Sequence, residues 1–386
     1  MNAGIQSGRD APPTVTGPAT ASVSPGQEAQ ASARFASLLS PRTTAASVKA
    51  PIRSAQLHEA SAAAAGMPER LAAALPLCRA ALANTVALFD CVSRGEAVPI
   101  SLAEQTVSDL LGGLDRDSIS LLSLIRLKAH GDYACMHSVA VCALMAALAR
   151  QMGFDDSQRQ QAALAGLLHD VGKALIPSDI LAKPGRLTDA EYTVVKGHPQ
   201  HGFDLLTATG GIADAIKDVA HHHHERPDGR GYPHRLAGDE ISVLSRMGAI
   251  CDVYDAITSN RPYKDGWDPA AAMRAMALWA EDGQFDVDLT AAFTAMMGIY
   301  PIGSLVRLRS ERLAVVSSKP TDMQPWMSVT AFYCLRTRQM TRPEKLDLGA
   351  PHQPDSIVDL ESNSKWRFRG LDSLWAGNLA QQLHGV

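Results

Sequence analysis

Four consecutive histidines, His221 to His224, lie in the middle of the chain within the segment HHHHERPDGRGYP at residues 221–233. Imidazole rings bind transition metals and exchange protons near neutral pH. Packing alone explains them poorly, because a buried imidazole is costly unless its nitrogens have partners. The segment therefore indicates a chemical role for some of the four rings, and helical phase is the first means of choosing among them.

The segment before the histidines has the apolar spacing i, i+4, i+7, i+8 of one buried helix stripe, formed by Ile212, Ile216, Val219 and Ala220. His223 falls on this stripe. At about 100° per residue, His221 points well away from it, and His222 and His224 lie near its two edges. Helical phase thus selects His223 and leaves the choice of a second ring open.

Histidines elsewhere also occupy helix positions where apolar residues are expected. His137 shares a face with apolar residues at helical spacing, Val141, Leu144, Met145 and Leu148. His169 lies at the end of a helix that we expect Gly172 to terminate, and its neighbour Asp170 can face the same cavity. Each of these residues alone is more often a hydrogen-bonded core residue than a metal ligand.

Two more helices contribute polar side chains. Thr188 and Glu191 form a capping box, and we expect the helix that they begin to carry His198 in its last turn. A later helix presents small and acidic residues on one face, as the wall of a pocket would, at Ser245, Gly248, Asp252 and Asp255. Because five separate helices would otherwise each need an unrelated buried partner, convergence on one metal centre explains these residues together.

Four motifs occur in order: LLHDVGK at 167–173, HP at 198–199, HHERPDGRGYP at 223–233 and CDVYDAITSNRPYK at 251–264. They resemble the motifs of the HD-GYP domain, a helical subgroup of the HD phosphohydrolases, over about residues 130 to 300. The resemblance implies a phosphodiesterase that hydrolyses cyclic di-GMP to linear pGpG, and in some members onward to GMP.

The resemblance also implies two divalent metal ions, with iron or manganese favoured and nickel or zinc as alternatives. Asp170 would bridge the two ions. The implied metal ligands are His137, His169, Asp170, His198, His223, His224 and Asp252. The alignment therefore adds His224 to His223 and leaves His221 and His222 outside the motif.

Other motif residues are implied to act on the substrate. Lys173 would contact a phosphate oxygen and act with Asp170 in catalysis, and Asp255 would either orient a metal ligand or protonate the leaving oxygen. The implied substrate contacts are Lys173, Arg226, Asp228, Gly231, Tyr232, Arg261 and Lys264. For Arg261 and Lys264, the plainer alternative is a pair of solvated charges at a helix end.

Some members of the HD-GYP family carry a glutamate four residues before the first histidine, where it helps to hold a third ion. This chain has Tyr133 there. A neutral phenol is a poor substitute for a carboxylate, so we predict two metals per chain and pGpG as the main product.

Two other functions remain open from the sequence. One is the same reaction on a different cyclic dinucleotide, and the other is a catalytically silent receptor or docking protein. The complete ligand set argues against the second. Diguanylate cyclase (GGDEF) proteins and a second copy of this chain are candidate partners.

Bulk properties restrict the remaining possibilities. A formal net charge of −4 argues against binding a nucleic acid polymer. The longest apolar stretch, Val139 to Ala149, is too short to span a membrane, and no signal-peptide pattern begins the chain, so we expect a cytoplasmic protein. The six cysteines form no CxxC pair and are expected to be reduced and mostly buried.

The predicted fold is mainly α, an HD-domain helical bundle with a helical region before it and a small β-rich appendage after it. Residues 1–60 are rich in Ala, Ser and Pro and are predicted to be disordered. A helical region follows at 61–128, interrupted near Gly95 and Pro99. The catalytic domain is predicted at 129–300, and the β-rich extension, with short alternating apolar runs, at 301–386.

Overall fold

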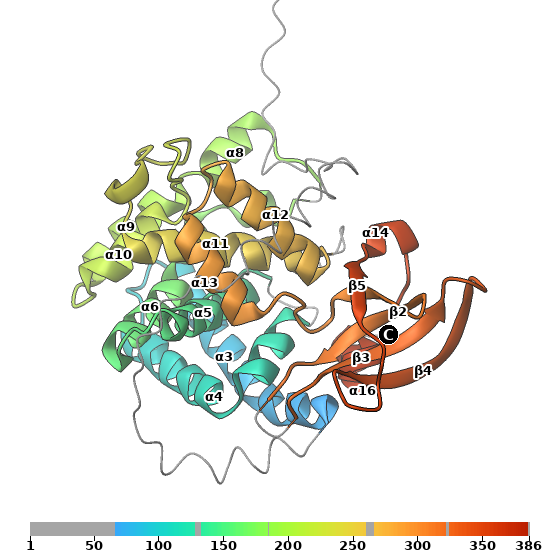
Figure 1. Cartoon of the computed structure of the whole chain (residues 1–386). Coiled ribbons are helices and arrows are strands. Elements are labelled where there is room, and N and C mark those ends of the chain that lie inside the picture. The colour runs from blue at the N-terminus through green and yellow to red at the C-terminus, as the bar shows by residue number, and fades with distance from the viewer. Residues whose placement is uncertain (1–65, 128–132, 184, 260–265, 322–323, 385–386) are drawn as a thin grey trace, which may run out of the picture. The chain divides into compact units, whose positions relative to one another are not determined.

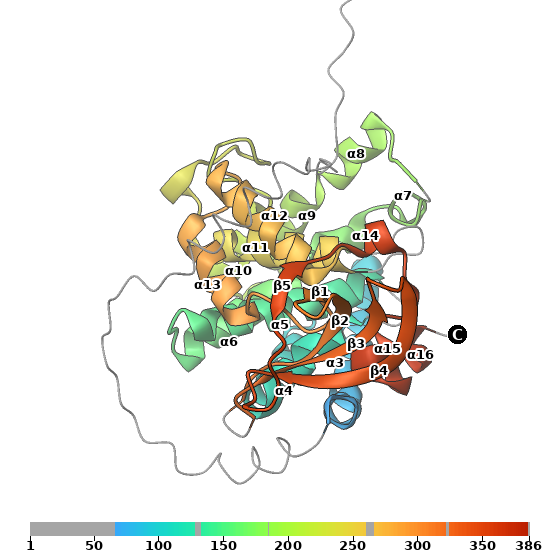
Figure 2. The ribbon, with the colours of Figure 1, turned by 45° about the vertical axis from the view of Figure 1, so that its right-hand side comes forward.

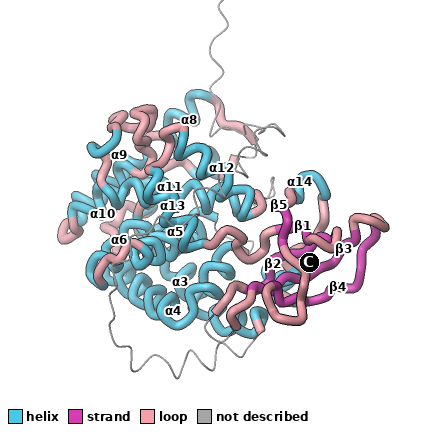
Figure 3. Tube along the Cα trace, in the orientation of Figure 1, coloured by secondary structure: helices cyan, strands magenta, loops and turns pink. Residues whose placement is uncertain are grey.

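The computed structural model describes residues 66–127, 133–183, 185–259, 266–321 and 324–384 (Figure 1). The tail predicted at 1–60 lies outside these ranges. Helices make up most of the described chain, and strands are confined to its C-terminal part (Figure 3). The mainly α fold with a small β-rich region is therefore confirmed, whereas the boundaries at residues 128 and 300 stay predictions.

Two long helices precede the residues of the motifs: α3, Met67–Ser93, and α4, Ile100–Arg126. They pack against each other, and Arg70 of α3 forms an ion pair with Asp117 of α4 at 2.6 Å. Gly95, with φ of 78°, lies in the turn between them, where few residues other than glycine are comfortable. The predicted interruption near Gly95 and Pro99 is confirmed.

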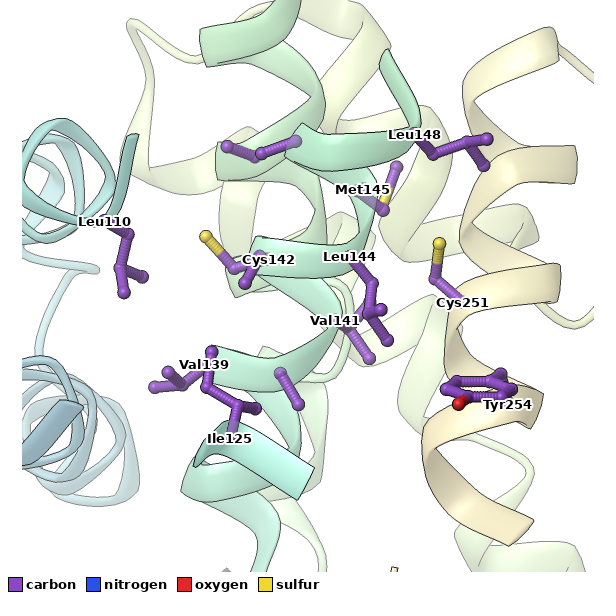
Figure 4. Close-up of a cluster of buried hydrophobic side chains, with 14 of the residues drawn as sticks. Leu110, Ile125, Val139, Val141, Cys142, Leu144, Met145, Leu148, Cys251 and Tyr254 are labelled. Atoms are coloured by element: carbon purple, nitrogen blue, oxygen red, sulfur yellow. The ribbon is translucent and has the colours of Figure 1, made fainter. Parts of the chain in front are cut away.

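The helix α5, Tyr133–Gln151, is the centre of the bundle and contacts α3, α4, α6, α11 and α13. Figure 4 shows Val139 and Cys142 on its side toward α4, and Leu144 and Met145 on its side toward α11. The other helices of the bundle are α6 (Asp156–Leu168), α7 (Ser178–Leu181), α8 (Asp189–Val195), α9 (His198–Thr209), α10 (Asp214–His222), α11 (Val243–Thr258), α12 (Pro269–Glu281) and α13 (Val287–Met297). Short 3-10 helices span Val171–Leu175 and Gly238–Glu240.

Two of the described helices, α3 and α5, have the length and apolar composition of a membrane span. In α5, 78% of the apolar window is buried inside the protein, compared with 28% in α3. Since the core helix of a soluble protein has the same composition as a span, these two helices are only a weak indication of membrane insertion. All six cysteines lie within the described ranges and form no disulfide, and four of them are buried.

The C-terminal part forms an antiparallel sheet of β1 (Leu305–Leu308), β2 (Arg312–Ser318), β3 (Met327–Cys334), β4 (Gln339–Leu348) and β5 (Ile357–Leu360), in the order β4-β3-β2-β1-β5. The helices α14 (Asn363–Trp366), α15 (Ser373–Ala376) and α16 (Asn378–His384) follow it (Figure 2). Both α15 and α16 contact α3. Leu313 and Phe332 of the sheet belong to the same hydrophobic core as the helices.

Two local predictions are wrong. The helix α6 ends at Leu168, before Gly172, and Gly172 lies in the following 3-10 helix. Its small size matters for a different reason, because a Cβ there would collide with the carbonyl oxygen of His198 and with Gly202. The helix α8 ends at Val195, so His198 begins α9 instead of ending α8. Proline is favoured in the first turn of a helix, and Pro199 occupies that place in α9.

We expect Gly172→Ala to lower the free energy of unfolding by about 1–3 kcal/mol, because the added methyl group pushes α9 away from the turn that follows α6. The control is Gly112→Ala in α4, where the new methyl group would meet only the flexible end of Arg116 at 3.5 Å. Alanine there should be neutral or slightly stabilising. Urea unfolding of the two variants measures the difference, and equal stabilities would contradict the close contact.

Candidate metal centre

The six other predicted ligands gather around Asp170, which is 1% exposed. His137 comes from α5, and His169 and Asp170 directly follow α6. The others lie at the start of α9, just after α10 and within α11, namely His198, His223, His224 and Asp252. His169 forms one group with His137 and Asp170, and the other three histidines form a second group with Asp170. The convergence of five helices inferred from the sequence is therefore present.

Three of the histidine rings are oriented in the same way. In His169, His198 and His223, Nδ1 donates a hydrogen bond to a backbone carbonyl, which leaves the Nε2 lone pair free to bind a ligand. The acceptors, in the same order, are Gly166 at 2.8 Å, Val195 at 2.7 Å and Val219 at 3.0 Å. The three Nε2 atoms lie 3.2, 3.1 and 3.7 Å from the Asp170 carboxylate.

Two buried atoms of this centre, Asp170 Oδ1 and His169 Nε2, have no hydrogen-bond partner within the described part of the chain. His198 Nε2 and His223 Nε2 face each other at 3.3 Å. Burial lowers the pKa of both rings, so both are neutral near pH 7 and turn lone pairs toward each other. Such an arrangement is unfavourable without a cation, and the centre therefore fits divalent metal ions.

The carboxyl group of Asp170 is held as an anion. Burial would raise its pKa, but electrostatic interactions with the neighbouring His169 and Lys173 hold the pKa well below the usual range. Lys173 Nζ lies 2.5 Å from Asp170 Oδ2, and its side chain is 23% exposed. Lys173 thus has one end of its side chain at the centre and remains accessible from solvent.

His137 is held between two carboxylates of α11. Its Nδ1 lies 2.6 Å from Asp255 Oδ2, and its Nε2 lies 2.8 Å from Asp252 Oδ1 and 3.6 Å from Asp170. Burial would lower the pKa of His137, but the hydrogen bonds to both carboxylates raise it. Asp255 therefore contacts the ring of a candidate ligand, and both of its predicted roles, orienting a metal ligand or protonating the leaving oxygen, stay predictions. The ring of Tyr133 is parallel to His137, with centroids 6.2 Å apart.

The loop after His224 returns to the centre. The ring of Tyr232 stacks on His224 with centroids 4.7 Å apart, and Lys196 Nζ lies 4.6 Å from the Tyr232 ring centre. Burial raises the pKa of the Tyr232 phenol, which stays neutral. At Gly231 a Cβ would collide with the backbone of Glu225. Tyr232 thus lies directly beside a candidate ligand, and Gly231 packs on the backbone of Glu225. Their contacts with a substrate stay predictions.

Some of the predicted substrate-binding residues contact other protein groups or lie outside the described residues. Arg226 and Asp228 form an ion pair with each other at 2.6 Å. Arg261 and Lys264 lie outside the described residues. The two histidines that the alignment left out, His221 and His222, are grouped with His234 and are described below.

Two residues of the centre were missed by the sequence argument. Glu225, 1% exposed, accepts hydrogen bonds from the backbone N–H groups of His234, Arg235 and Leu236, at 2.6, 3.0 and 3.1 Å. In the sequence Glu225 was noted only as part of the HHERPDGRGYP motif. An acidic residue just before a glycine-rich loop is a signal for such a role. Lys196 gave no signal, because its contact with Tyr232 spans 36 residues of sequence.

The sequence profile of the HD domain family matches residues 115–289. A cyclic di-GMP phosphodiesterase of Pseudomonas aeruginosa is 45% identical over 317 residues, which are 82% of this chain and 76% of that protein. A cyclic di-GMP phosphodiesterase response regulator of Xanthomonas campestris is 40% identical over 36% of each chain. A 3'3'-cGAMP-specific phosphodiesterase of Vibrio cholerae is 41% identical over 31% of this chain and 23% of its own length.

The helical bundle and its histidine–aspartate cluster define an HD-domain phosphohydrolase, a class whose members bind divalent metals. Similarity over most of both chains allows a narrower assignment. The chain belongs to the HD-GYP family within that class.

We expect Glu225→Gln to loosen the loop that carries Tyr232. An amide group turns an N–H toward the three backbone donors, so at least one of them loses its acceptor, at a cost of about 1–3 kcal/mol. Hydrogen exchange at residues 234–236 should become faster. The control is Glu240→Gln, which affects a single exposed hydrogen bond to Ala237. Unchanged exchange in the Glu225 variant would show that the carboxylate does not hold the loop.

Proposed function

We propose that this HD-domain phosphodiesterase hydrolyses cyclic di-GMP to linear pGpG at a centre of two divalent metal ions. The observation that carries the proposal is the division of the histidines by the two oxygens of Asp170. His137 and His169 lie nearest Oδ2, at 3.6 and 3.2 Å, whereas His198 and His223 lie nearest Oδ1, at 3.1 and 3.7 Å. A carboxylate with a separate set of imidazoles at each oxygen is suited to bridging two ions.

The donor set limits the identity of the metals. The candidate ligands offer imidazole nitrogen and carboxylate oxygen, a mixture that suits iron, manganese, nickel or zinc. We propose iron or manganese, with nickel or zinc as the alternatives. When bound, such ions polarise a phosphodiester and lower the pKa of water.

The protein's own side chains would position the substrate around these ions. We assign to Lys173 a contact with a phosphate oxygen, because it is the cation beside Asp170 with a partly exposed side chain. Tyr232, stacked on His224, offers its ring to a guanine base. Arg226, Asp228 and Gly231 would shape the wall beside Tyr232. Arg261 and Lys264 remain proposed phosphate contacts from the sequence motif.

We further propose that the catalytic centre holds two ions instead of three. Tyr133 lies one helical turn before His137, and its ring is parallel to that of His137. A phenol at this place offers a third ion no carboxylate. The main product would then be pGpG, because the centre lacks an additional ion to hold a terminal phosphate.

The choice of cyclic di-GMP rests on the similarity to the Pseudomonas aeruginosa enzyme, which extends over most of both chains. The cGAMP-specific relative matches a much smaller share of its own length. We therefore place another cyclic dinucleotide second, and a silent receptor third, since both groups of histidines around Asp170 are complete. A cytoplasmic location, diguanylate cyclase partners and a homodimer complete the proposal.

We expect Asp170→Asn to reduce cyclic di-GMP turnover by more than about 100-fold and to reduce the bound metal. A neutral amide cannot balance two cations, and losing even a group that merely supports a metal ligand costs 10–100-fold. Chromatography of cyclic di-GMP digests and elemental analysis measure the two effects. The control is Asp156→Asn, at a fully exposed carboxylate of α6. Full turnover in the Asp170 variant would refute the metal mechanism.

The four consecutive histidines should divide into two pairs by function. His223→Ala and His224→Ala should each remove metal from the second group around Asp170 and abolish most of the turnover, because both rings belong to that group. His221→Ala and His222→Ala should reduce turnover much less. If the first pair proved harmless and the second essential, both the helical phase and the motif alignment would be wrong.

A further inference from the structure

Three histidines outside the catalytic centre form a second cluster, which we call the histidine triplet: His221, His222 and His234. One ring nitrogen of each lies within 4.8 Å of the others. The His221 ring stacks on His222 with centroids 4.5 Å apart and meets His234 edge-on at 4.6 Å. Helical phase separates this cluster from the catalytic centre, although His222 and His223 are neighbours in sequence.

His222 has the arrangement of a supported metal ligand. Its Nδ1 donates to Asp218 Oδ1 at 2.7 Å, and the other Asp218 oxygen accepts from the hydroxyl groups of Ser242 and Ser245 at 2.5 and 2.8 Å. A carboxylate that fixes one nitrogen of an imidazole leaves the other free to bind a metal. The free nitrogen, Nε2, lies 3.2 Å from Nδ1 of His234. Two nitrogens bound to one tetrahedral zinc ion are separated by roughly 3.3 Å, so this spacing fits a shared ion.

The other two rings of the triplet are also held in place by groups outside it. His221 is 7% exposed, its Nε2 is 3.0 Å from Gln200 Oε1, and its ring stacks on Phe203 at 4.4 Å. The backbone of His234 is fixed by its N–H bond to Glu225. A hydrogen bond between His222 and His234 would account for two of the rings. It would not explain why a third imidazole and a supporting carboxylate are built around them.

We propose that the histidine triplet is a zinc site distinct from the catalytic centre. Three imidazoles suit zinc, and the exposed side chain of His234 leaves the fourth position to water. The ion would tie the end of α10 to the loop after Tyr232, joining His221 and His222 to His234. Zinc binding at the triplet does not depend on the proposed function. Any effect of the zinc ion on substrate binding does depend on it, because the loop would act on the substrate through Tyr232.

Anomalous diffraction at the zinc edge locates the ion directly. The full chain is purified without a histidine tag, since tag histidines bind the same metal, and is crystallised with zinc chloride. We expect an anomalous peak between the three rings, about 2.0–2.1 Å from each coordinating nitrogen. A map with zinc at the catalytic centre and none at the triplet would overturn the proposal.

Zinc stoichiometry in solution tests the same site with variants. His222→Gln and His234→Ala should each lower the zinc bound after dialysis by one equivalent per chain. His352→Ala, at an exposed histidine of the C-terminal part, should leave it unchanged. Asp170→Asn should keep the zinc of the triplet, so failure of the catalytic centre and failure of the triplet give different results. Since the side chain of His234 is exposed, its variant should fold even if the His222 variant does not. Equal zinc content in wild type and the His234 variant would refute the site.

Discussion

A carboxylate buried where Asp170 lies is costly unless its charge is balanced, and the rest of the helical bundle is arranged around this requirement. Lys173 supplies one nearby positive charge, and His198 and His223 turn the lone pairs of their Nε2 atoms toward each other, an arrangement that an added cation would satisfy. Elements widely separated in the sequence therefore meet at one side chain. The near-complete burial of α5 follows from the same demand, because α5 must place His137 at the centre while packing against neighbours on several sides.

Helix ends solve the problem of orienting the imidazoles. The last carbonyls of a helix have no partner within it. Gly166, Val195 and Val219 lie in the last turns of α6, α8 and α10, and each of their carbonyls accepts Nδ1–H from one histidine. The ends of three helices must then converge, which explains why α9 lies so close to Gly172. Carbonyl groups at helix ends thus set the direction of these candidate ligands, and the carbonyl of Val219 also accepts the backbone N–H of His223.

The sequence was sufficient for the helical class, the strands of the C-terminal part and the residues gathered at Asp170, because periodicity and motif order act over short distances. It failed at His198, where the pattern of α8 continues into α9 and only the break near Gly197 separates them. The sequence predicted that Gly172 ends a helix, whereas Gly172 is needed for close packing against His198. That contact arises from tertiary structure, which helical periodicity does not reveal. Lys196 was missed for the same reason. Helical phase separated His223 from His221 and His222 but could not show that the latter two meet His234.

The C-terminal sheet looks like an appendage in the sequence but shares the interior of the bundle. Phe332 and Trp375 belong to the same apolar core as the helices, and the Asp268 carboxylate before α12 accepts the N–H of Leu305 in β1 at 2.7 Å. A fragment that stopped near residue 300 would therefore expose apolar surface and leave Asp268 without one of its hydrogen-bond donors. Such a fragment would contain every candidate metal ligand. It would nevertheless be less stable than the full chain and less suitable for expression and enzyme assays.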